Sequence, residues 1–493
     1  MSAHNFDNVA RPGSDNLSCA VEVASQAPMT MSLLPQITPE ARRYAVKELA
    51  RRAGVSKEFF QTWVIETSPE HTTISLGSGL NATVQFVHYH GRMFDEIAGG
   101  AIPVARAGWL AGGQDPIPGS DLIVPFCDSE TNSGAPLYQP NGDRGLICRL
   151  DILASFLFTL SRVEEALCQT HDEHGRFPAS ASLALRHDFL ERPTLDEHGL
   201  AFQQALFSLL PAWQPQPRTL KLKLTHDIDN IGIPFLIRTS IGHSLKRRRP
   251  AATLRDLLSL MSDGLPVELS QVLTLANISS SRGFCSAFYW KGSPLGPRDS
   301  GYDPRHKKVQ NVIDNLRRRG FELGVHPGYE TFGDRGKLRS EVELLRQVLQ
   351  VNCPGGRQHY LRWTADTWLD WEACGLSYDS TLGFADHFGF RAGTGVPYHP
   401  WSLHDNRELA LIEVPLVLMD CTPVKYMKLP RAEALLRINA LIQRMKQTGG
   451  VFTLLWHNTP LLDPDYDGWY ESILDLLANV QNFEGPWIGE PLW

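Results

Sequence analysis

The stretch that decides the fold spans residues 219–230 and reads Thr-Leu-Lys-Leu-Lys-Leu-Thr-His-Asp-Ile-Asp-Asn. Its first half alternates polar and apolar side chains, which is the period of a β-strand. Because residues i and i+2 of a strand share a face, Asp227 and Asp229 point the same way where this strand ends. Two neighbouring carboxylates repel each other, and a divalent metal ion would relieve the repulsion. Asp and Asn are also common turn formers, so a solvated strand end stays open as the alternative.

The size and composition of the chain limit the classes of protein to which it can belong. A chain of 493 residues is long enough for two to three domains. The net charge of -7 gives no general nucleic-acid signal. The eight cysteines lack metal-finger spacing, and we expect reduced thiols. Residues 1–26 lack a basic stretch followed by an apolar run, and no apolar run reaches about 18 residues, so we expect a cytoplasmic protein without a membrane span.

The proline-rich residues 211–217 are the expected linker between two domains. We predict an irregular N-terminus over residues 1–35 and a smaller α+β domain over 36–215. Residues 39–53 of that domain have helical spacing, with a proline in the first helical position. The larger domain is predicted over residues 216–493.

After the linker, short β-rich runs alternate with amphipathic stretches, which favours a parallel sheet with helical crossovers. About seven strands over about 275 residues fit a distorted (β/α) barrel better than a doubly wound sheet. No Gly-x-Gly-x-x-Gly follows the first strand, so a dinucleotide cofactor is not expected. The expected strands are 220–225, 286–290, 321–325, 358–363, 376–380, 409–418 and 451–456.

Polar side chains recur where several of these strands end, which is where a (β/α) barrel carries its chemistry, and Arg357 stands where another strand begins. Taken singly, each is a plausible capped turn or surface residue. Their repetition at successive strand ends predicts an active site there. The residues concerned are His226, Asp227, Asp229, His326, Glu330, Arg357, His359, Tyr360, Asp379 and His457.

In this arrangement residues 216–493 resemble the polysaccharide deacetylases of the NodB-homology type, carbohydrate esterase family 4. Residues 225–230 are similar to the first motif of that family, although its two carboxylates are usually adjacent. The resemblance implies that Asp227 is the catalytic base and that Asp229 is a metal ligand. His226 faces the opposite side of the strand, and we expect a structural role for it.

The family's metal-binding motif places a second histidine four residues after the first. His326 corresponds to the first histidine, and Glu330 stands where the second is usual. The implied ligand set is therefore Asp229, His326 and Glu330, holding a divalent metal, with Zn²⁺ foremost. Alternatively, Glu330 is not a ligand and water takes its place.

Two further motifs complete the resemblance. Residues 357–360 are similar to Arg-x-Pro-Tyr, which implies that Arg357 orients the base and that the Tyr360 N–H helps to hold an oxyanion. Residues 454–457 are similar to the closing Leu-x-x-His, which implies that His457 is the general acid. Asp379 is a candidate partner for His457.

The resemblance implies a hydrolase that removes an N-acetyl or other N-acyl group from a sugar in bacterial polysaccharide or glycoconjugate biosynthesis. His359, Arg391 and Trp456 are the expected substrate contacts. Trp363 and Phe390 are further candidates for sugar stacking, although core packing explains the aromatic residues equally well. Residues 80–210 resemble an accessory domain found before such catalytic domains, for which no chemistry is implied.

Three alternatives stay open. The substrate could be a formylated lipid-linked sugar or a non-sugar amide, or the domain could be a degenerate module that only binds glycan. The sugar could be lipid-linked or nucleotide-linked, and no nucleic-acid partner is expected. Residues Lys246–Arg249 form a dense basic run, which is either a solvated turn or a contact with an anionic membrane surface.

Overall fold

The strand β8 (Leu220–Ile228) lies at the centre of a parallel sheet and ends at the predicted Asp pair. The computed structural model describes residues 37–480 with gaps at 78, 80, 90–101, 111–115, 118–119, 127–133 and 232–264, together with 483–486 and 492. The predicted irregular N-terminus, residues 1–35, and the basic run Lys246–Arg249 lie outside the described residues.

The sheet around β8 is parallel throughout, in the order β10-β9-β8-β16-β15, and β17 also pairs with β8. β8 and β16 are buried at almost every position, as expected for parallel strands that are covered on both faces. The remaining strands are β9 (Ser286–Trp290), β10 (Glu322–Val325), β15 (Leu418–Met419), β16 (Gly450–Leu455) and β17 (Phe483–Pro486).

Gly356 continues the pairing beyond β10. It forms parallel bridges to Val325 on one side and to Asp379 on the other. A Cβ atom on Gly356 would lie 1.9 Å from the Val325 carbonyl oxygen, so only glycine fits between the two strands. Asp379 belongs to β11 (Tyr378–Asp379), which pairs in parallel with β14 (Ile412–Glu413).

The prediction of a mixed α/β fold with parallel strands is confirmed, whereas a closed barrel is not shown. Pairing around the expected ring is reduced to single bridges at Gly356, and the expected strand 409–418 is split into β14 and β15. The expected strand 358–363 is wrong. Its centre is a short 3₁₀ turn, η4 (His359–Leu361), in which Tyr360 and Leu361 have φ of 63° and 55°.

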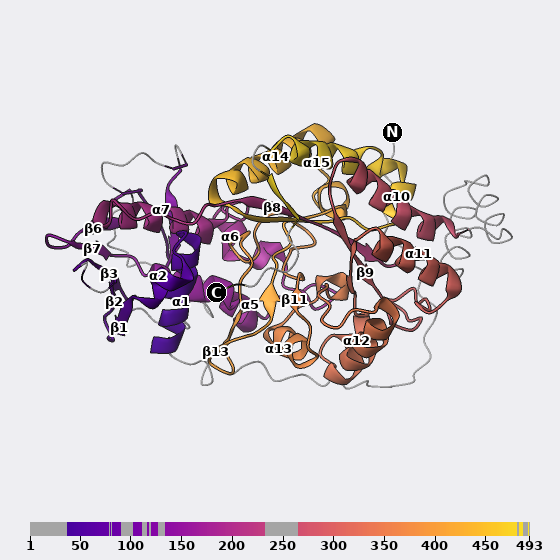
Figure 1. The fold of residues 1–493 in the computed structure, drawn as a ribbon, viewed down its shortest axis with the longest axis horizontal. Helices are drawn as coiled ribbons and strands as arrows, with labels where there is room; N and C mark the ends of the chain where they lie inside the picture. Colours follow the sequence, from indigo (N-terminus) through magenta and orange to yellow (C-terminus); the bar gives the residue numbers. More distant parts are fainter. Residues whose placement is uncertain are drawn as a thin grey trace, which may run out of the picture.

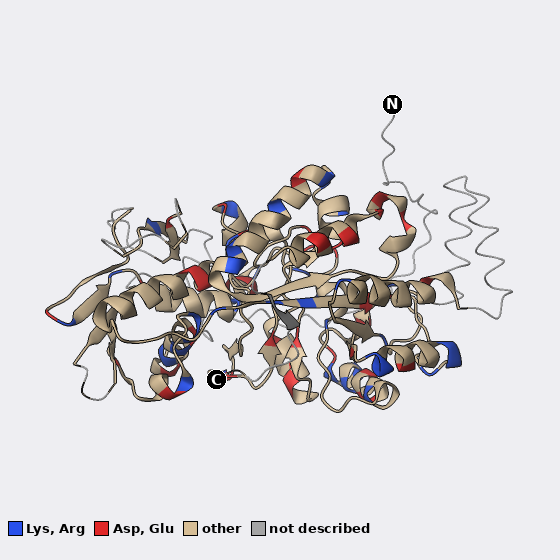
Figure 2. Ribbon diagram, turned by 45° about the horizontal axis from the view of Figure 1, so that its top comes forward, with Lys and Arg blue, Asp and Glu red and all other residues tan. Residues whose placement is uncertain are grey.

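Helices cover both faces of the parallel sheet (Figure 1). α10, α14 and α15 lie on one side, and α12 and α13 lie on the other. Lys, Arg, Asp and Glu are interspersed along these helices (Figure 2). Among the described residues, no helix is both long and apolar enough to cross a membrane. The helix bounds are α10 (Val267–Ser281), α11 (Lys307–Arg318), α12 (Arg335–Leu349), α13 (Ala365–Ala373), α14 (Arg431–Thr448) and α15 (Trp469–Ala478).

The N-terminal elements form a second sheet in the order β1-β2-β3-β7-β6 at the other end of the molecule (Figure 1). β2 and β3 alternate buried and half-buried side chains, because one face of the sheet packs on the core and the other does not. The strands are β1 (Val64–Thr67), β2 (His71–Ser75), β3 (Thr83–Val87), β6 (Tyr138–Pro140) and β7 (Gly145–Cys148), with a separate pair β4 (Val104–Ala107) and β5 (Leu122–Pro125).

The predicted helix over residues 39–53 is α1 (Pro39–Arg52), with Pro39 in its first turn and the Thr38 side chain accepting a hydrogen bond from the Ala41 N–H. The other helices of this part are α2 (Lys57–Gln61), α4 (Ile152–Leu160), α5 (Val163–Leu167), α6 (Leu183–Arg186) and α7 (Thr194–Leu209).

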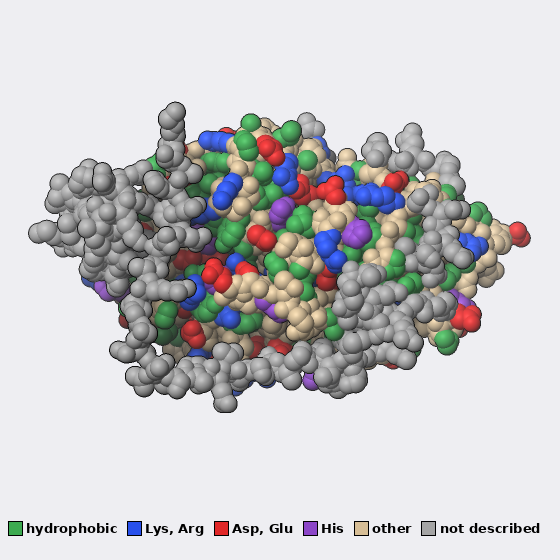
Figure 3. Space-filling model, turned by 180° about the vertical axis from the view of Figure 1, so that it is seen from behind, with side chains coloured by type: hydrophobic (Ala, Val, Ile, Leu, Met, Phe, Trp, Pro, Cys, Tyr) green, Lys and Arg blue, Asp and Glu red, His purple; other side chains and the backbone are tan. Residues whose placement is uncertain are grey.

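The two parts are joined by an irregular segment over residues 210–219 and by buried polar contacts. Arg52 donates to the Thr394 hydroxyl at 3.2 Å, and Asp196 accepts from the Gly395 N–H at 2.9 Å. Histidines and charged side chains of both signs are interspersed over the centre of the face shown in Figure 3. The predicted division into 36–215 and 216–493 follows the two sheets, and it stays a prediction as a statement about independent domains.

Candidate active site

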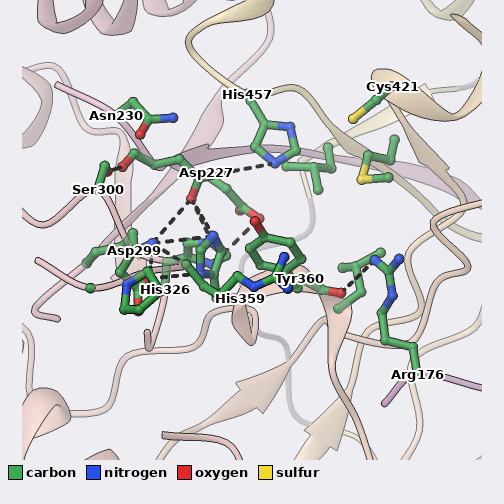
Figure 4. Close-up of a pocket in the computed structure, with 18 of the residues that line it drawn as sticks. Arg176, Asp227, Asn230, Asp299, Ser300, His326, His359, Tyr360, Cys421 and His457 are labelled. Atoms are coloured by element: carbon green, nitrogen blue, oxygen red, sulfur yellow. Dashed lines mark hydrogen bonds and ion pairs between the residues drawn. The ribbon is translucent and has the colours of Figure 1, made fainter. Parts of the chain in front are cut away.

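A cavity of about 510 Å³ opens where β8, β9, β10 and β16 end. Six of the residues predicted from the sequence line it (Figure 4): Asp227, Asp229, His326, His359, Tyr360 and His457. Arg357 lies directly behind the cavity, through its contact with Asp227. The structure therefore brings these side chains together, and their functional roles stay predictions.

Asp227 is held by a buried arginine. Arg357 Nη1 lies 2.9 Å from Asp227 Oδ1, and the same guanidinium donates to the Thr225 hydroxyl and to the Ser380 carbonyl. Arg357 is fully buried. A guanidinium in this position fixes the direction of the Asp227 carboxylate.

Asp229 meets two histidines on the other side of the cavity floor. Its Oδ1 lies 3.1 Å from His326 Nε2 and 3.4 Å from His359 Nε2, and the three side chains can offer one ligand atom each to a common ion. The Nδ1 atoms are engaged elsewhere, with the Arg357 carbonyl at 2.8 Å and with Asp299 at 2.9 Å. Such partners fix both rings with Nε2 directed towards Asp229.

Two atoms of this group lack partners. Asp229 Oδ1 and His326 Nε2 are buried, and neither makes a hydrogen bond of acceptable geometry with any described residue. Buried polar atoms are rarely left unsatisfied unless an ion or a ligand completes them. One carboxylate and two imidazoles are a donor set that suits Zn²⁺ and related divalent ions.

Glu330 does not belong to this group, which corrects the predicted ligand set. Its side chain is exposed on the 3₁₀ turn η3 (Tyr329–Thr331), outside the residues that line the cavity. The spacing of four residues suggested two ligands on one face of a helix, but Pro327 and Gly328 lead into a turn that carries Glu330 away. His359, expected to contact substrate, lies beside Asp229 and His326.

Sequence reasoning missed Lys291 and Asp299 at this site. Lys291 follows β9 directly. Its Nζ lies 3.1 Å from His359 Nδ1 and 3.9 Å from Asp229 Oδ1, and it forms an ion pair with Asp299. Burial alone would raise the pKa of Asp229, but His359, His326 and Lys291 together hold it well below its usual value. A charged residue straight after the apolar run 286–290 was the signal for Lys291.

His457 is paired with Asp420, not with the predicted Asp379. Its Nδ1 lies 3.0 Å from Asp420 Oδ1, and its Nε2 is 3.7 Å from Asp229 Oδ2. Burial would lower the pKa of His457, but Asp420 beside it, with Asp229 and Asp227, raises that pKa to about 9. Asp379 is buried and hydrogen-bonds to Thr381 instead. Asp420, Cys421 and His457 also lie close enough to share an ion, and the last two line the same cavity.

The aromatic substrate contacts predicted from the sequence are wrong. Trp456 is 1% exposed and packs on Tyr466 and Tyr470, and Trp363 and Phe390 are equally buried. His226 is buried with its Nδ1 2.8 Å from the Trp456 carbonyl, in the structural position expected for it. Alternation along a strand puts an aromatic side chain on one face, but it does not say which face is the cavity.

Arg391, which was also predicted to contact substrate, forms a buried ion pair instead. It is buried and makes a two-bond ion pair with Glu165 of α5, at 2.9 and 2.5 Å, across the junction of the two parts. Glu165 is held by Arg162 as well, at 2.6 Å. Arg391 therefore ties the two parts together, and it does not line the main cavity.

Replacing Arg391 with methionine should destabilise the protein by about 3 kcal/mol, since it leaves a buried carboxylate with one cationic partner in place of two. Urea unfolding of the full chain measures the change. The matched control is Arg437→Ala, which removes a partly exposed ion pair with Glu191 across the same junction and should cost less than about 1 kcal/mol. Equal losses for the two variants would contradict the structural role given to Arg391.

Part of the chain matches a family model, and just over half of it is similar to solved structures. A family of unknown function, DUF7033, matches residues 31–211. No curated protein matches the chain. A solved structure of a candidate polysaccharide deacetylase from Mycobacterium smegmatis is similar at 17% identity and a TM-score of 0.37, over 56% of this chain and 89% of that one.

Two further solved structures are similar at the same low level. One is a candidate polysaccharide deacetylase involved in O-antigen biosynthesis from Bordetella bronchiseptica, at 17% identity and a TM-score of 0.27, over 54% of this chain and 83% of that one. The other is a 4-alpha-glucanotransferase from Thermococcus litoralis, at 12% identity and a TM-score of 0.31, over 54% and 37%. Likeness at these TM-scores carries no argument about function, which must come from the site.

Proposed function

We propose that this chain is a metal-dependent hydrolase that removes an N-acetyl or other N-acyl group from a sugar. The supporting observation is the convergence of three pairings on one cavity. Asp227 is paired with Arg357, Asp229 with two histidines, and His457 with Asp420. A base, a set of metal ligands and an acid are the parts that amide hydrolysis needs.

Asp229, His326 and His359 would hold the metal, because their ligand atoms lie close together. A divalent ion held there supplies Lewis acidity to the amide carbonyl and favours ionisation of water. Asp299 keeps His359 turned towards the ion, and the Arg357 carbonyl does the same for His326. Zn²⁺ is the ion we propose for this donor set.

The proton transfers are assigned to residues on opposite sides of the cavity. Asp227 takes the proton of the attacking water while Arg357 holds its carboxylate in place. A bond forms between the water oxygen and the carbonyl carbon, and the C–N bond then breaks. His457, kept protonated by Asp420, donates a proton to the departing nitrogen, which cannot leave as an anion. The Tyr360 N–H is the proposed donor to the carbonyl oxygen as it becomes negative.

The charged and polar character of the cavity supports a sugar as the class of substrate, since such a lining suits hydroxyl groups. A role in bacterial glycan biosynthesis, a lipid-linked or nucleotide-linked sugar and a cytoplasmic location remain part of the proposal. The test is metal analysis of the purified protein, combined with amine release from N-acetylated nucleotide sugars and lipid-linked sugars. N-formyl analogues distinguish a deformylase, and protein without metal or hydrolysis would contradict the proposal.

Lys291 favours one alternative, a glycan-binding module without metal. Its ammonium group lies among Asp229, His359 and Asp299 and supplies positive charge where an ion would otherwise be needed. In that case the purified protein would bind glycan with no stoichiometric metal and would release no amine. Metal content therefore separates the two functions before any substrate is known.

Substitution of the third ligand tests the metal centre directly. We expect His359→Ala to lose bound metal on dialysis, because one of three protein ligands is removed, and Glu330→Ala to retain it, because Glu330 is exposed outside the cavity. Metal is measured by elemental analysis against protein concentration. Retention of metal by His359→Ala together with its loss by Glu330→Ala would restore the ligand set expected from the sequence.

A further inference from the structure

A turn of the N-terminal part reaches into the candidate active site. Arg176, which follows α5 in the chain, lines the cavity, and its Nη1 donates to the carbonyl oxygen of Tyr360 at 3.0 Å (Figure 4). The guanidinium is fixed from behind by Asp172, whose Oδ2 accepts from Arg176 Nε at 2.7 Å. The residue is largely buried, with 11% of its side chain exposed.

The turn that carries Arg176 is built to hold it. Asp172 Oδ1 accepts from the backbone N–H groups of His174 and Arg176, both at 2.9 Å. The Asp172 N–H donates to the Arg176 carbonyl, and Gly175 between them has a φ of 72°. Glycine adopts this left-handed conformation without strain. Arg176 is thus preorganised before it meets Tyr360.

Tyr360 is held in an unfavourable backbone conformation at this contact. It has a φ of 63°, and Leu361 has a φ of 55°, so two successive residues with side chains lie in the left-handed region. This conformation is unfavourable for a residue with a side chain and persists only where its surroundings hold it. One of the groups that hold the turn is Arg176, on the Tyr360 carbonyl.

The ring of Tyr360 is held by the same segment. The His174 ring lies 4.5 Å from the Tyr360 ring, and Tyr329 lies 5.2 Å away on another side. Arg362 ties these neighbours together by donating to the His174 carbonyl at 2.8 Å and to the Tyr329 carbonyl at 2.9 Å. Residues 172–176 therefore fix both the peptide and the ring of a residue next to His359.

We propose that Arg176 is a positioning residue of the active site, and that the N-terminal part completes this site. Its guanidinium fixes the peptide of Tyr360, and with it the side of the cavity that faces the reacting carbonyl. This inference rests on the proposed hydrolase function. Other ion pairs across the junction, such as Arg437 with Glu191 and Arg444 with Glu197, involve no residue that lines this cavity.

The position of Arg176 also extends the site towards the N-terminal part. A second cavity of about 260 Å³ shares Arg176 and Tyr426 with the main one. Its other lining residues come from both parts of the chain, with Phe177 on one side and Phe384 on the other. Arg176 therefore stands where the two cavities meet, and removing its side chain would widen the active-site cavity as well as release the Tyr360 peptide.

The test compares Arg176→Ala with Arg437→Ala in the full-length protein loaded with metal. We expect Arg176→Ala to keep its metal and to lower kcat by about 10²-fold with a much smaller change in KM, because a misplaced positioning group affects the reacting geometry more than binding. Added guanidinium ion should restore part of the kcat. Arg437→Ala should retain the kcat of the unchanged protein.

The outcomes separate the two proposals. If the protein without substitutions hydrolyses no N-acyl sugar, the proposed function itself is refuted. If the protein without substitutions is active and Arg176→Ala has the same kcat, only the role proposed for Arg176 is refuted. If Arg176→Ala does not fold, Arg176→Lys is used. Lysine retains a cation for Asp172, but it cannot bind Asp172 and the Tyr360 carbonyl at once as the guanidinium does. A folded lysine variant with full kcat overturns the inference, and a selective loss of kcat supports it.

Discussion

Asp227→Asn is expected to lower kcat by about 10³-fold while the protein keeps its full content of metal. An asparagine oxygen can still accept the hydrogen bond from Arg357 Nη1, so the local geometry is preserved. The amide cannot take the proton of the attacking water, so the general base alone is lost. The measurement is kcat for amine release, with metal analysis on the same preparation.

The neighbouring carboxylate supplies the contrast. Asp229→Ala is expected to lose both metal and activity, because Asp229 Oδ1 is the atom on which both histidines converge. The two substitutions are two residues apart on one strand face, so a general effect on folding would affect both in the same way. Loss of metal from Asp227→Asn would make Asp227 a ligand, and retention of metal and activity by Asp229→Ala would refute the site.

The sequence predicted those parts of the fold that local patterns determine. β9 has the predicted bounds, and α1 begins at the expected proline because the cap and the proline act locally. The stretch 358–363 looked like a strand from its aromatic and β-prone residues, but the pairing position is Gly356. A glycine that is required by the close approach of two strands carries no signal in hydrophobic periodicity.

The same limit applies to the site. Strand ends are a local feature, and reading them predicted Asp227, Asp229, His326, Arg357 and His457, which the structure places in or directly behind one cavity. Which side chains then meet depends on the turns that follow the strands. Glu330 is turned outwards after Pro327, and His359 is turned inwards, next to the left-handed Tyr360. A conformation of this kind at a residue other than glycine is set by distant contacts, so it could not be read from the sequence.

The partner of His457 was misassigned for a related reason. Asp379 and Asp420 both lie at strand ends, and the sequence gives no distance between either of them and His457. Asp420 follows β15, which pairs directly with β16, so its carboxylate meets His457, two residues after the end of β16. Asp379 lies on β11, which is not a neighbour of β16 in the sheet. Strand order, which only the structure supplies, decided between them.

Asp420→Asn is expected to lower kcat by about 10²-fold at neutral pH and to shift the alkaline limb of the pH profile to lower pH. His457 donates a proton, so activity falls as the pH rises through the pKa of this histidine. Burial favours the neutral ring, and Asp420 provides the largest opposing effect, which raises the pKa to about 9. Removing that carboxylate lowers the pKa, so less of His457 is protonated at neutral pH and the decline begins earlier.

The control for this shift is a second pair of the same composition. His404 Nδ1 lies 2.8 Å from Asp405 Oδ1 in an exposed position away from the cavity. Asp405→Asn should therefore leave both kcat and the pH profile unchanged. A fall in kcat for Asp420→Asn with an unmoved alkaline limb would mean that Asp420 only orients the ring. An unchanged kcat would mean that His457 is not the acid, and the proton would have to reach the leaving nitrogen from another group in the cavity.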